Sequence, residues 1–408
     1  MAEEKRGFVK SFLDMCFNGI SFGWLSTEEA RQRNEQNRPA VVVDGMQYIL
    51  NTKREIERQN VEKEKGVEKL GKSMKDYVHQ LFDEKNASTV VLVFDNYGER
   101  KGVPKMKHHS TKEKYSMRQF IGEICEVLID DLQNELDSEQ TFTCVGHFDK
   151  EGIGTVTQVS SGGVRNLENV RHDEADTIMW NVAAKLPEQH VILQSPDSDM
   201  VMIGLGLMEY FSNKIISMEL ENSNINVIDG KTLVKFTKEL PVLQSFTDDE
   251  RIEFIQIMYV ITGCDYIQYY FDMDKKFFLE WLKCIPKNLY CDNLMTFTYN
   301  LIVTAIVSRQ VGKENVLNVL KNKQEVLNLN IPLDTEVLFS ELKNNVKMKR
   351  FLEKIDGMKS NDDFLYENFE SRWRLTEKTL KMWNNSLSNE LPETFDICIN
   401  NLNTERTH

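Results

Sequence analysis

Several features that would place a protein in a familiar class are missing from this sequence. No apolar stretch reaches the roughly 20 residues that a membrane-spanning helix needs, and the first residues, MAEEKRGF, lack the apolar core of a signal peptide. The seven cysteines are odd in number and contain no Cys-x-x-Cys pair, which argues against a disulfide framework and a zinc knuckle. We therefore expect an intracellular protein of the nucleus or cytoplasm with reduced thiols, neither secreted nor bound to a membrane.

The sequence also contains no internal repeat, no long low-complexity segment and no convincing Ser or Cys catalytic triad. Its 408 residues, of which 41% are hydrophobic and 28% charged, are enough for one large core and a smaller second domain. A catalytic function would therefore have to use other residue types, and the acidic residues are the first to consider.

The net charge of −14 at pH 7 argues at first against a nucleic-acid partner, but basic residues are unevenly distributed. Between Arg100 and Arg118 there are seven Lys or Arg residues and one acidic residue, Glu113, so the local net charge is 7 − 1 = +6. Such a segment either binds phosphates or forms a solvated loop face. Excess negative charge elsewhere is compatible with a metal site, because bound cations offset it.

Strands and helices alternate over the first two-thirds of the sequence. The short β-branched runs 40–44, 90–95 and 191–194 are typical of fully buried parallel strands. Between the first two lies a long polar helix with an apolar stripe from Val67 to Leu81 that includes Tyr77. This alternation predicts an α/β fold with an open, mostly parallel twisted sheet and helices on both faces.

Other segments do not follow this alternation. Residues 104–137 are expected to be helical, and the Gly-, Ser- and Thr-rich stretch 152–163 predicts a loop or weak hairpin. Beyond residue 283 the pattern is mostly helical, and Trp373 and Trp383 are expected to be core anchors rather than a binding surface.

Acidic residues follow the predicted strands at one strand end after another. The seven residues concerned are Asp44, Asp95, Glu174, Asp176, Asp197, Asp199 and Asp265. In an open parallel sheet the functional crevice lies beyond the carboxyl ends of the strands. A carboxylate beside a buried strand is costly unless something cationic gathers it. Oxygen-only ligand sets bind hard divalent ions such as Mg²⁺ or Mn²⁺, so this set predicts a site for two such ions.

Each acidic residue taken alone has a simpler explanation. An Asp after a strand is usually a helix cap or a turn former, and acidic residues favour the first turn of a helix. Asp197 and Asp199 are harder to explain in this way, because two like charges so close repel each other without a counter-ion. Independent caps would not supply acid at successive strand ends around one crevice, so the metal site is the favoured interpretation.

Five motifs, taken in order, resemble a known family. They are VVVDG, VFDNYGERKG, DEADTIMWNVA, SPDSDMVMIG and YVITGCDY. This series resembles the flap endonuclease and XPG-type branch of the PIN-like 5′-nucleases, and the chain would be a divergent member. Asp44 and Asp95 are 95 − 44 = 51 residues apart, and Asp176 and Asp197 are 197 − 176 = 21 apart, spacings close to those of the family.

The resemblance implies a domain organisation and an activity. A PIN-like nuclease domain would span residues 1–283, with an arch-like insertion at about 97–137, and a helical C-terminal region would span 284–408. The activity would be metal-dependent, structure-specific hydrolysis of phosphodiester bonds in DNA with flaps or free 5′ ends. One ion would activate the attacking water while the other stabilises the leaving oxygen.

The same resemblance gives roles to individual residues. The first ion would be held by Asp44, Asp95, Glu174 and Asp176. The second would be held by Asp197, Asp199 and Asp265, with Asp176 shared. The candidates for nucleic-acid binding are Lys101, Lys105, Lys107 and Lys112, in the position of the family's arch, and Tyr48. Tyr48 would stack on a base, but its register is displaced by two residues, and core packing explains it equally well.

Two parts of the sequence depart from the family, and two alternatives stay open. Residues 267–282 contain no glycine for the hairpin with which the family grips duplex DNA, and no PCNA-type peptide is evident. An RNA-directed 5′-exonuclease or endoribonuclease could use the same site, because carboxylates and lysines do not distinguish RNA from DNA. A non-catalytic PIN-like scaffold that binds nucleic acid or protein is the second alternative.

Overall fold

The structure is a computed structural model of the chain, and part of the chain is described. The described residues are 24–25, 27–46, 48–50, 63–95, 111–148, 154–170, 175–211, 213–221, 224–228, 246–264, 267, 275–285, 289–290, 294–327, 331–332, 335–350, 353 and 366–384.

By internal contacts the chain divides into two compact units. The sheet unit consists of Gly19–Gly230 with Met382–His408, and the helical unit of Met1–Asn18 with Lys231–Lys381. The boundary expected at residue 283 rests on the change to a mostly helical sequence pattern, and it stays a prediction.

The sheet unit contains all strands of the main sheet. In chain order its elements are β1 (Trp24–Leu25), α2 (Thr27–Asn37), β2 (Ala40–Asp44), α4 (Lys63–Lys85), β3 (Thr89–Val93), α5 (Thr111–Leu132), β4 (Thr141–Phe148), β5 (Gly154–Ser160), β6 (Gly163–Val170), α6 (Ala175–Lys185), β7 (His190–Gln194), α7 (Asp199–Leu207), the 3₁₀ turn η1 (Met208–Phe211), β8 (Ile215–Glu221) and β9 (Asn224–Ile228).

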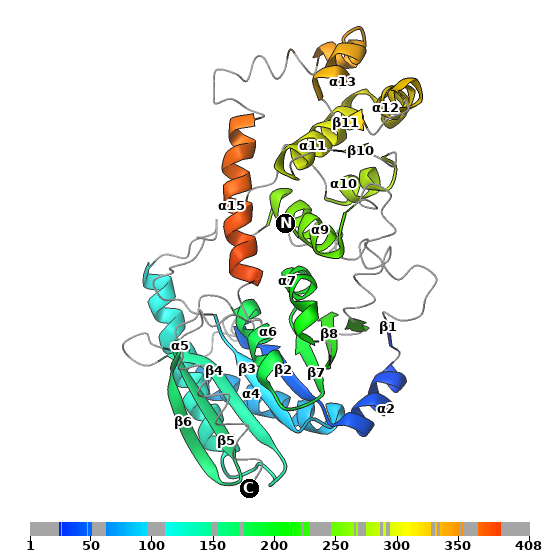
Figure 1. The fold of residues 1–408 in the computed structure, drawn as a ribbon. Helices are drawn as coiled ribbons and strands as arrows, with labels where there is room; N and C mark the ends of the chain where they lie inside the picture. Colours follow the sequence, from blue (N-terminus) through cyan, green and yellow to red (C-terminus); the bar gives the residue numbers. More distant parts are fainter. Residues whose placement is uncertain are drawn as a thin grey trace. The chain divides into compact units, whose positions relative to one another are not determined.

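These strands form one nine-stranded mixed sheet in the order β1-β9-β8-β7-β2-β3-β4-β5-β6 (Figure 1). The five central strands, β8 to β4 in this order, are parallel, whereas β5 and β6 at one edge and β9 and β1 at the other pair antiparallel. The predicted α/β class is confirmed. The prediction of a mostly parallel sheet holds for the centre, and both edges are antiparallel extensions.

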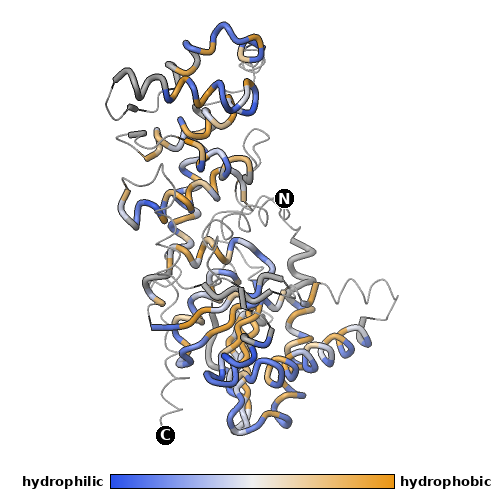
Figure 2. The backbone as a smooth tube through the Cα atoms, turned by 90° about the vertical axis from the view of Figure 1, so that its right-hand side faces the viewer, coloured by the Kyte–Doolittle hydropathy of each residue, from blue (hydrophilic) through white to orange (hydrophobic). Residues whose placement is uncertain are grey.

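The central strands are buried on both faces, which explains why their sequences are continuously apolar. Val41 and Val43 of β2 belong to a core cluster with residues of α4 and α5. Side chains alternate along a strand, so Ala40 and Val42, both 0% exposed, point to the opposite face, where α6 lies against β2, β3 and β7. Figure 2 shows hydrophobic segments in the interior of the lower part of the drawing, and a long helix at its margin along which hydrophobic and hydrophilic residues alternate.

Helices α4 and α5 form the layer on the first face. Gly71 of α4 allows their close approach, because a Cβ there would lie 2.6 Å from Cγ1 of Val127 on α5. Beneath them, the Sγ atoms of Cys125 on α5 and Cys144 on β4 lie 3.4 Å apart, both fully buried. Burial raises the pKa of the Cys125 thiol. Such a thiol is a packing group rather than a nucleophile.

Helices α6 and α7 on the other face are joined through one tryptophan. The indole N–H of Trp180 on α6 donates to the carbonyl oxygen of Met200 on α7 at 3.1 Å. A Cβ at Gly204 would lie 2.2 Å from Cζ2 of the same indole, so α7 can approach Trp180 only because residue 204 is glycine. At the other end of α6, the ammonium of Lys214 donates to the carbonyl oxygens of Ala183 and Leu186. It thereby satisfies acceptors that a helix end leaves open.

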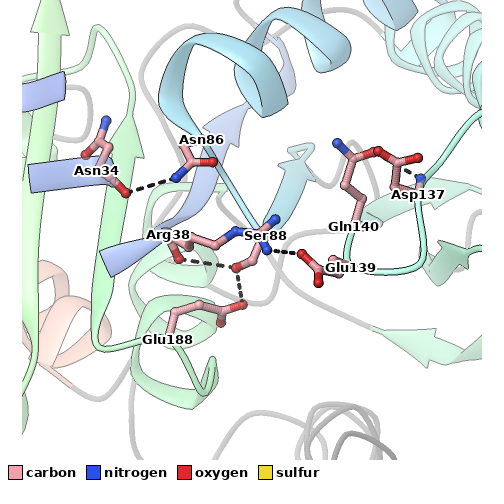
Figure 3. A network of polar contacts seen from close by, with 8 residues as sticks. All are labelled: Asn34, Arg38, Asn86, Ser88, Asp137, Glu139, Gln140 and Glu188. Carbon is pink, nitrogen blue, oxygen red and sulfur yellow. Dashed lines mark hydrogen bonds and ion pairs between the residues drawn. The ribbon is translucent and has the colours of Figure 1, made fainter. Parts of the chain in front are cut away.

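A polar network closes the amino end of the parallel strands (Figure 3). The Ser88 hydroxyl lies 2.9 Å from Oε1 of Glu188 and 3.3 Å from the carbonyl oxygen of Arg38, and Thr89 donates to the same Glu188 oxygen at 2.7 Å. The Arg38 guanidinium pairs with Glu139. These residues lie at or just before the starts of β2, β3, β4 and β7, so the network joins the four strands at their amino ends.

The helical unit is built around α11. Its elements are α9 (Asp248–Ile261), α10 (Lys275–Leu282), the short strands β10 (Leu289–Tyr290) and β11 (Ile331–Pro332), α11 (Leu294–Val311), α12 (Lys313–Leu327), α13 (Thr335–Leu342) and α15 (Tyr366–Asn384), whose last residues belong to the sheet unit. Trp281 of α10 donates to the hydroxyl of Thr304 on α11 at 3.1 Å. Trp373 and Trp383 of α15 are buried, as the sequence predicts. Among the described residues, no helix has the length and apolarity to cross a membrane.

We predict that Gly204→Ala destabilises the sheet unit by about 1–3 kcal/mol, because the new methyl group would overlap the Trp180 ring and force α6 and α7 apart. The measurement is the free energy of unfolding from urea titration. Gly162→Ala is the matched control, since the atom nearest to its Cβ would be a serine hydroxyl at 3.6 Å. Equal stability of the two variants would contradict the packing described for α7.

A second prediction concerns His190, the first residue of β7, which is 1% exposed and has Nε2 2.7 Å from the Ser217 hydroxyl. Burial, followed by the positive charge of Arg33, lowers the pKa of His190 to about 4. Between pH 6.5 and 4 the unfolded chain binds a proton here that the folded protein does not bind, so stability is lost as the pH falls.

At pH 4.5 this loss should be on the order of 2 kcal/mol relative to pH 7. His190→Gln, which does not titrate, should lose correspondingly less stability between the two pH values. Urea midpoints of both proteins at each pH provide the comparison. Identical pH dependence would mean that His190 is not the buried neutral base described.

Candidate functional site

Three neighbouring parallel strands carry aspartates at their carboxyl ends. Asp44 ends β2, Asp95 lies two residues beyond β3, and Asp197 lies three residues beyond β7. β2 pairs with β3 on one side and with β7 on the other, so these strand ends are adjacent. From β2 the chain continues to β3 and β4 on one side and returns to β7 and β8 on the other. The strand order therefore reverses between β2 and β7, and open sheets bind ligands at such a switch point.

The first two motifs are in direct contact. The carboxylate of Asp44 accepts the backbone N–H of Met46 at 3.0 Å. Gly45 lies under the ring of Phe94, where a Cβ would come within 2.4 Å of that ring. The glycine of VVVDG is thus required by the phenylalanine that precedes Asp95. Val43 faces α4 and α5, so strand alternation directs Asp44 toward the face covered by α6.

Asp95 connects the second strand end to helix α6. Its Oδ1 accepts the backbone N–H of Ala175, the first residue of α6, at 2.9 Å. This bond caps the helix from a position 80 residues earlier in the chain. It also brings the acidic first turn of α6, which contains Asp176, to the carboxyl end of β3.

The third strand end forms a compact turn into α7. The Ser195 hydroxyl accepts the N–H of Asp197 at 3.2 Å, and Oδ1 of Asp197 accepts the N–H of Asp199 at 3.0 Å. Asp199, which is 4% exposed, is the first residue of α7. The partial positive charge of a helix N-terminus stabilises a carboxylate there. The sequence SPDSD therefore presents two acidic groups from one turn.

Five of the seven predicted ligands lie in described residues of the sheet unit. Asp44, Asp95, Asp176, Asp197 and Asp199 all belong to the sheet unit and lie at the carboxyl ends of its strands or in the first turns of α6 and α7. Glu174 and Asp265 lie outside the described residues. Within the part of the chain that is described, no three His, Cys, Asp or Glu side chains form a group able to hold a metal ion. The seven-residue metal site therefore stays a prediction.

Most of the predicted nucleic-acid contacts cannot be placed. Lys101, Lys105 and Lys107 lie outside the described residues, and Lys112 lies in the first turn of α5 without a described side chain. Tyr48 is half-buried, and its hydroxyl lies 2.7 Å from the Ser73 hydroxyl and 3.0 Å from the Ser73 carbonyl oxygen. Base stacking by Tyr48 stays a prediction, and the contacts observed for Tyr48 are within the sheet unit.

Sequence reasoning missed a polar group behind the site. The Tyr77 hydroxyl donates to Oε1 of Gln194 at 2.6 Å, the Gln194 amide donates to Glu219, and Lys85 Nζ lies 2.6 Å from Oε1 of Glu219. From the sequence, Tyr77 is predicted only to belong to the apolar stripe of its helix. One signal was present: Gln194 and Glu219 are polar residues next to apolar residues of β7 and β8, and they lie directly opposite each other in the two strands.

No protein-family model matches the chain, and no curated protein matches it either. The resemblance to PIN-like nucleases therefore rests on the ordered motifs.

We predict that Asp95→Ala lowers the free energy of unfolding by about 1 kcal/mol, because the N–H of Ala175 loses its acceptor. Asp95→Asn keeps an amide oxygen at the same position and should stay within about 0.5 kcal/mol of the wild type. Urea titration of the three proteins at neutral pH measures the difference. An alanine variant as stable as the wild type would show that this bond does not hold the start of α6.

Proposed function

We propose that this protein is a divalent-metal-dependent 5′-nuclease of the PIN-like, flap endonuclease type that hydrolyses phosphodiester bonds in DNA with flaps or free 5′ ends. One observation carries the proposal. The carboxyl ends of β2, β3 and β7 are adjacent at the switch point of the sheet and carry Asp44, Asp95 and Asp197. The order and spacing of the sequence motifs that contain these residues support the same conclusion.

The donor set is compatible with Mg²⁺ or Mn²⁺, because all its groups are carboxylates and hard divalent ions prefer oxygen ligands. Asp44, Asp95, Glu174 and Asp176 are proposed to hold one ion. Asp197, Asp199 and Asp265 are proposed to hold the other. Two ions bound in this way supply Lewis-acid catalysis of phosphodiester hydrolysis.

Residues of the chain position the carboxylates and are proposed to attract the nucleic acid. The capping bond from Ala175 to Asp95 fixes the start of α6 beside β3, and the turn through Ser195 fixes Asp197 and Asp199 relative to each other. The basic segment that follows Asp95, with Lys101, Lys105, Lys107 and Lys112, is proposed to draw the nucleic-acid backbone toward these carboxylates. Its charge of +6 would offset repulsion between the phosphates and the acidic strand ends.

The test is cleavage of end-labelled nucleic acid by the purified protein with Mg²⁺ or Mn²⁺. Asp197→Asn/Asp199→Asn should lower the cleavage rate by at least about a hundredfold, because it removes two proposed metal ligands. The thermal stability of this variant should be unchanged or higher, since two like charges are neutralised. Asp130→Asn, an exposed acidic residue of α5, is the matched control and should cleave like the wild type.

Four substrates distinguish the possible outcomes: single-stranded DNA, 5′-flap DNA, nicked duplex DNA and single-stranded RNA. Preference for a DNA end or flap supports the proposed substrate, whereas preference for RNA would replace DNA by RNA at the same site. A double variant that cleaves as fast as the wild type would end the metal-site hypothesis. If the wild-type protein leaves every substrate intact with either ion, a non-catalytic scaffold becomes the better description.

A further inference from the structure

Tyr77 of α4 contacts both chain segments that meet at the switch point. Its ring stacks on that of Tyr48, with 4.8 Å between ring centroids and 18° between ring planes. Its hydroxyl donates to Oε1 of Gln194 at 2.6 Å. Tyr48 lies four residues after Asp44, and Gln194 lies three residues before Asp197. One side chain therefore links the segment that follows β2 to the end of β7.

Further contacts hold each partner of Tyr77 in place. The Tyr48 hydroxyl is bound by Ser73, one helical turn before Tyr77 on α4. The Gln194 amide donates to Glu219 on β8, whose carboxylate also pairs with Lys85 from the last turn of α4. Both segments are thus anchored to the same helix, and Tyr77 is the residue that contacts the two together.

The placement of Tyr77 indicates a positioning role rather than contact with ions or substrate. Val43 and Gln194 are neighbours across β2 and β7, and Val43 faces the layer of α4 and α5. Because side chains alternate along a strand, Asp44 points to the opposite face of the sheet. Tyr77 therefore lies on the α4 and α5 side of the sheet, opposite to the side toward which Asp44 points. It can act on the acidic residues only through the backbones of the two segments.

The Tyr77 hydroxyl is suited to be a permanent donor. Burial, followed by the negative charge of Glu219 and the neighbouring Tyr48, raises the pKa of Tyr77 above its usual value. The phenol therefore keeps its proton at every pH at which the folded protein would be assayed. Its hydrogen bond to Gln194 is therefore kept throughout this pH range.

We infer that Tyr77 is a positioning residue that holds the Asp44-bearing and Asp197-bearing segments in register, and so sets how well the strand-end carboxylates bind a divalent ion. The effect on ion binding rests on the proposed function, whereas the effect on the two segments does not. Residues behind a metal site that orient its ligands are commonly worth 10- to 100-fold in metal affinity.

The first test needs no metal and uses hydrogen–deuterium exchange of the full chain. Tyr77→Phe keeps the stacked ring and removes only the hydroxyl. It should raise the exchange rate of the Asp197 and Asp199 amides by about fivefold, since loss of one hydrogen bond changes a local opening equilibrium by roughly this factor. Exchange in helix α9 of the helical unit should be unchanged. If the amides of residues 194–200 exchange in Tyr77→Phe at the same rates as in the wild type, the inference is wrong.

The second test measures Mn²⁺ affinity by calorimetric titration and cleavage as a function of Mn²⁺ concentration. Tyr77→Phe should weaken Mn²⁺ binding about tenfold while the rate at saturating Mn²⁺ stays within about twofold of the wild type. Ser88→Ala is the matched control, because it removes a hydrogen bond from the amino end of the same sheet. It should reduce thermal stability and leave Mn²⁺ affinity unchanged.

The outcomes separate this inference from the proposed function. If the wild type binds Mn²⁺ and Tyr77→Phe binds it equally well, the inference is wrong and the proposed function stands. If Ser88→Ala weakens binding as much as Tyr77→Phe, the effect is one of general stability, and the inference is again wrong. If the wild type binds no Mn²⁺, the proposed function fails, and the exchange measurement alone decides whether Tyr77 holds the two segments.

Discussion

Hydrogen bonding between parallel strands is the constraint on which the rest of the sheet unit depends. Five strands that run in one direction bring all their carboxyl ends to one edge of the sheet, whatever side chains they carry. The strand order reverses between β2 and β7, and open parallel sheets commonly bind ligands at the carboxyl ends of strands at such a point. Asp44, Asp95 and Asp197 are far apart in sequence, and backbone pairing places them at the ends of adjacent strands.

The amino ends and the carboxyl ends of the parallel strands make different polar contacts. At the amino end, the Ser88 hydroxyl binds the Arg38 carbonyl oxygen and the Glu188 carboxylate and ties strand starts together. At the carboxyl end, the side-chain oxygens of Asp44, Asp95 and Asp197 accept backbone N–H groups. Such bonds fix the direction in which a carboxylate points. One edge therefore provides stability, and the other provides oriented negative charge, the arrangement that a cationic ligand requires.

The sequence was most informative where local pattern and burial coincide. The strands at 40–44, 90–95 and 191–194 were predictable because continuous apolar runs are local signals. The hairpin of β5 and β6, expected only as a loop or weak hairpin over 152–163, gains its order by pairing with β4, which the sequence does not reveal. The same limit applies within the site. Asp95 was identified as a ligand candidate, but its bond to Ala175 connects positions 80 residues apart, and no periodicity encodes such a contact.

The contact between Trp180 and α7 has a mechanical consequence. An indole that donates to the Met200 carbonyl and fills the space left by Gly204 packs α6 and α7 directly against each other. Asp176 and Asp199 are carried on this helix pair, whereas Asp44 and Asp95 are carried on the strands. The acidic edge is thus assembled from two pieces, a fixed sheet and a helix pair. The two pieces are joined, because Ala175 at the start of α6 donates its N–H to Asp95 beyond β3. We therefore expect a displacement of α6 to shift Asp95, Asp176 and Asp199 together rather than one carboxylate at a time.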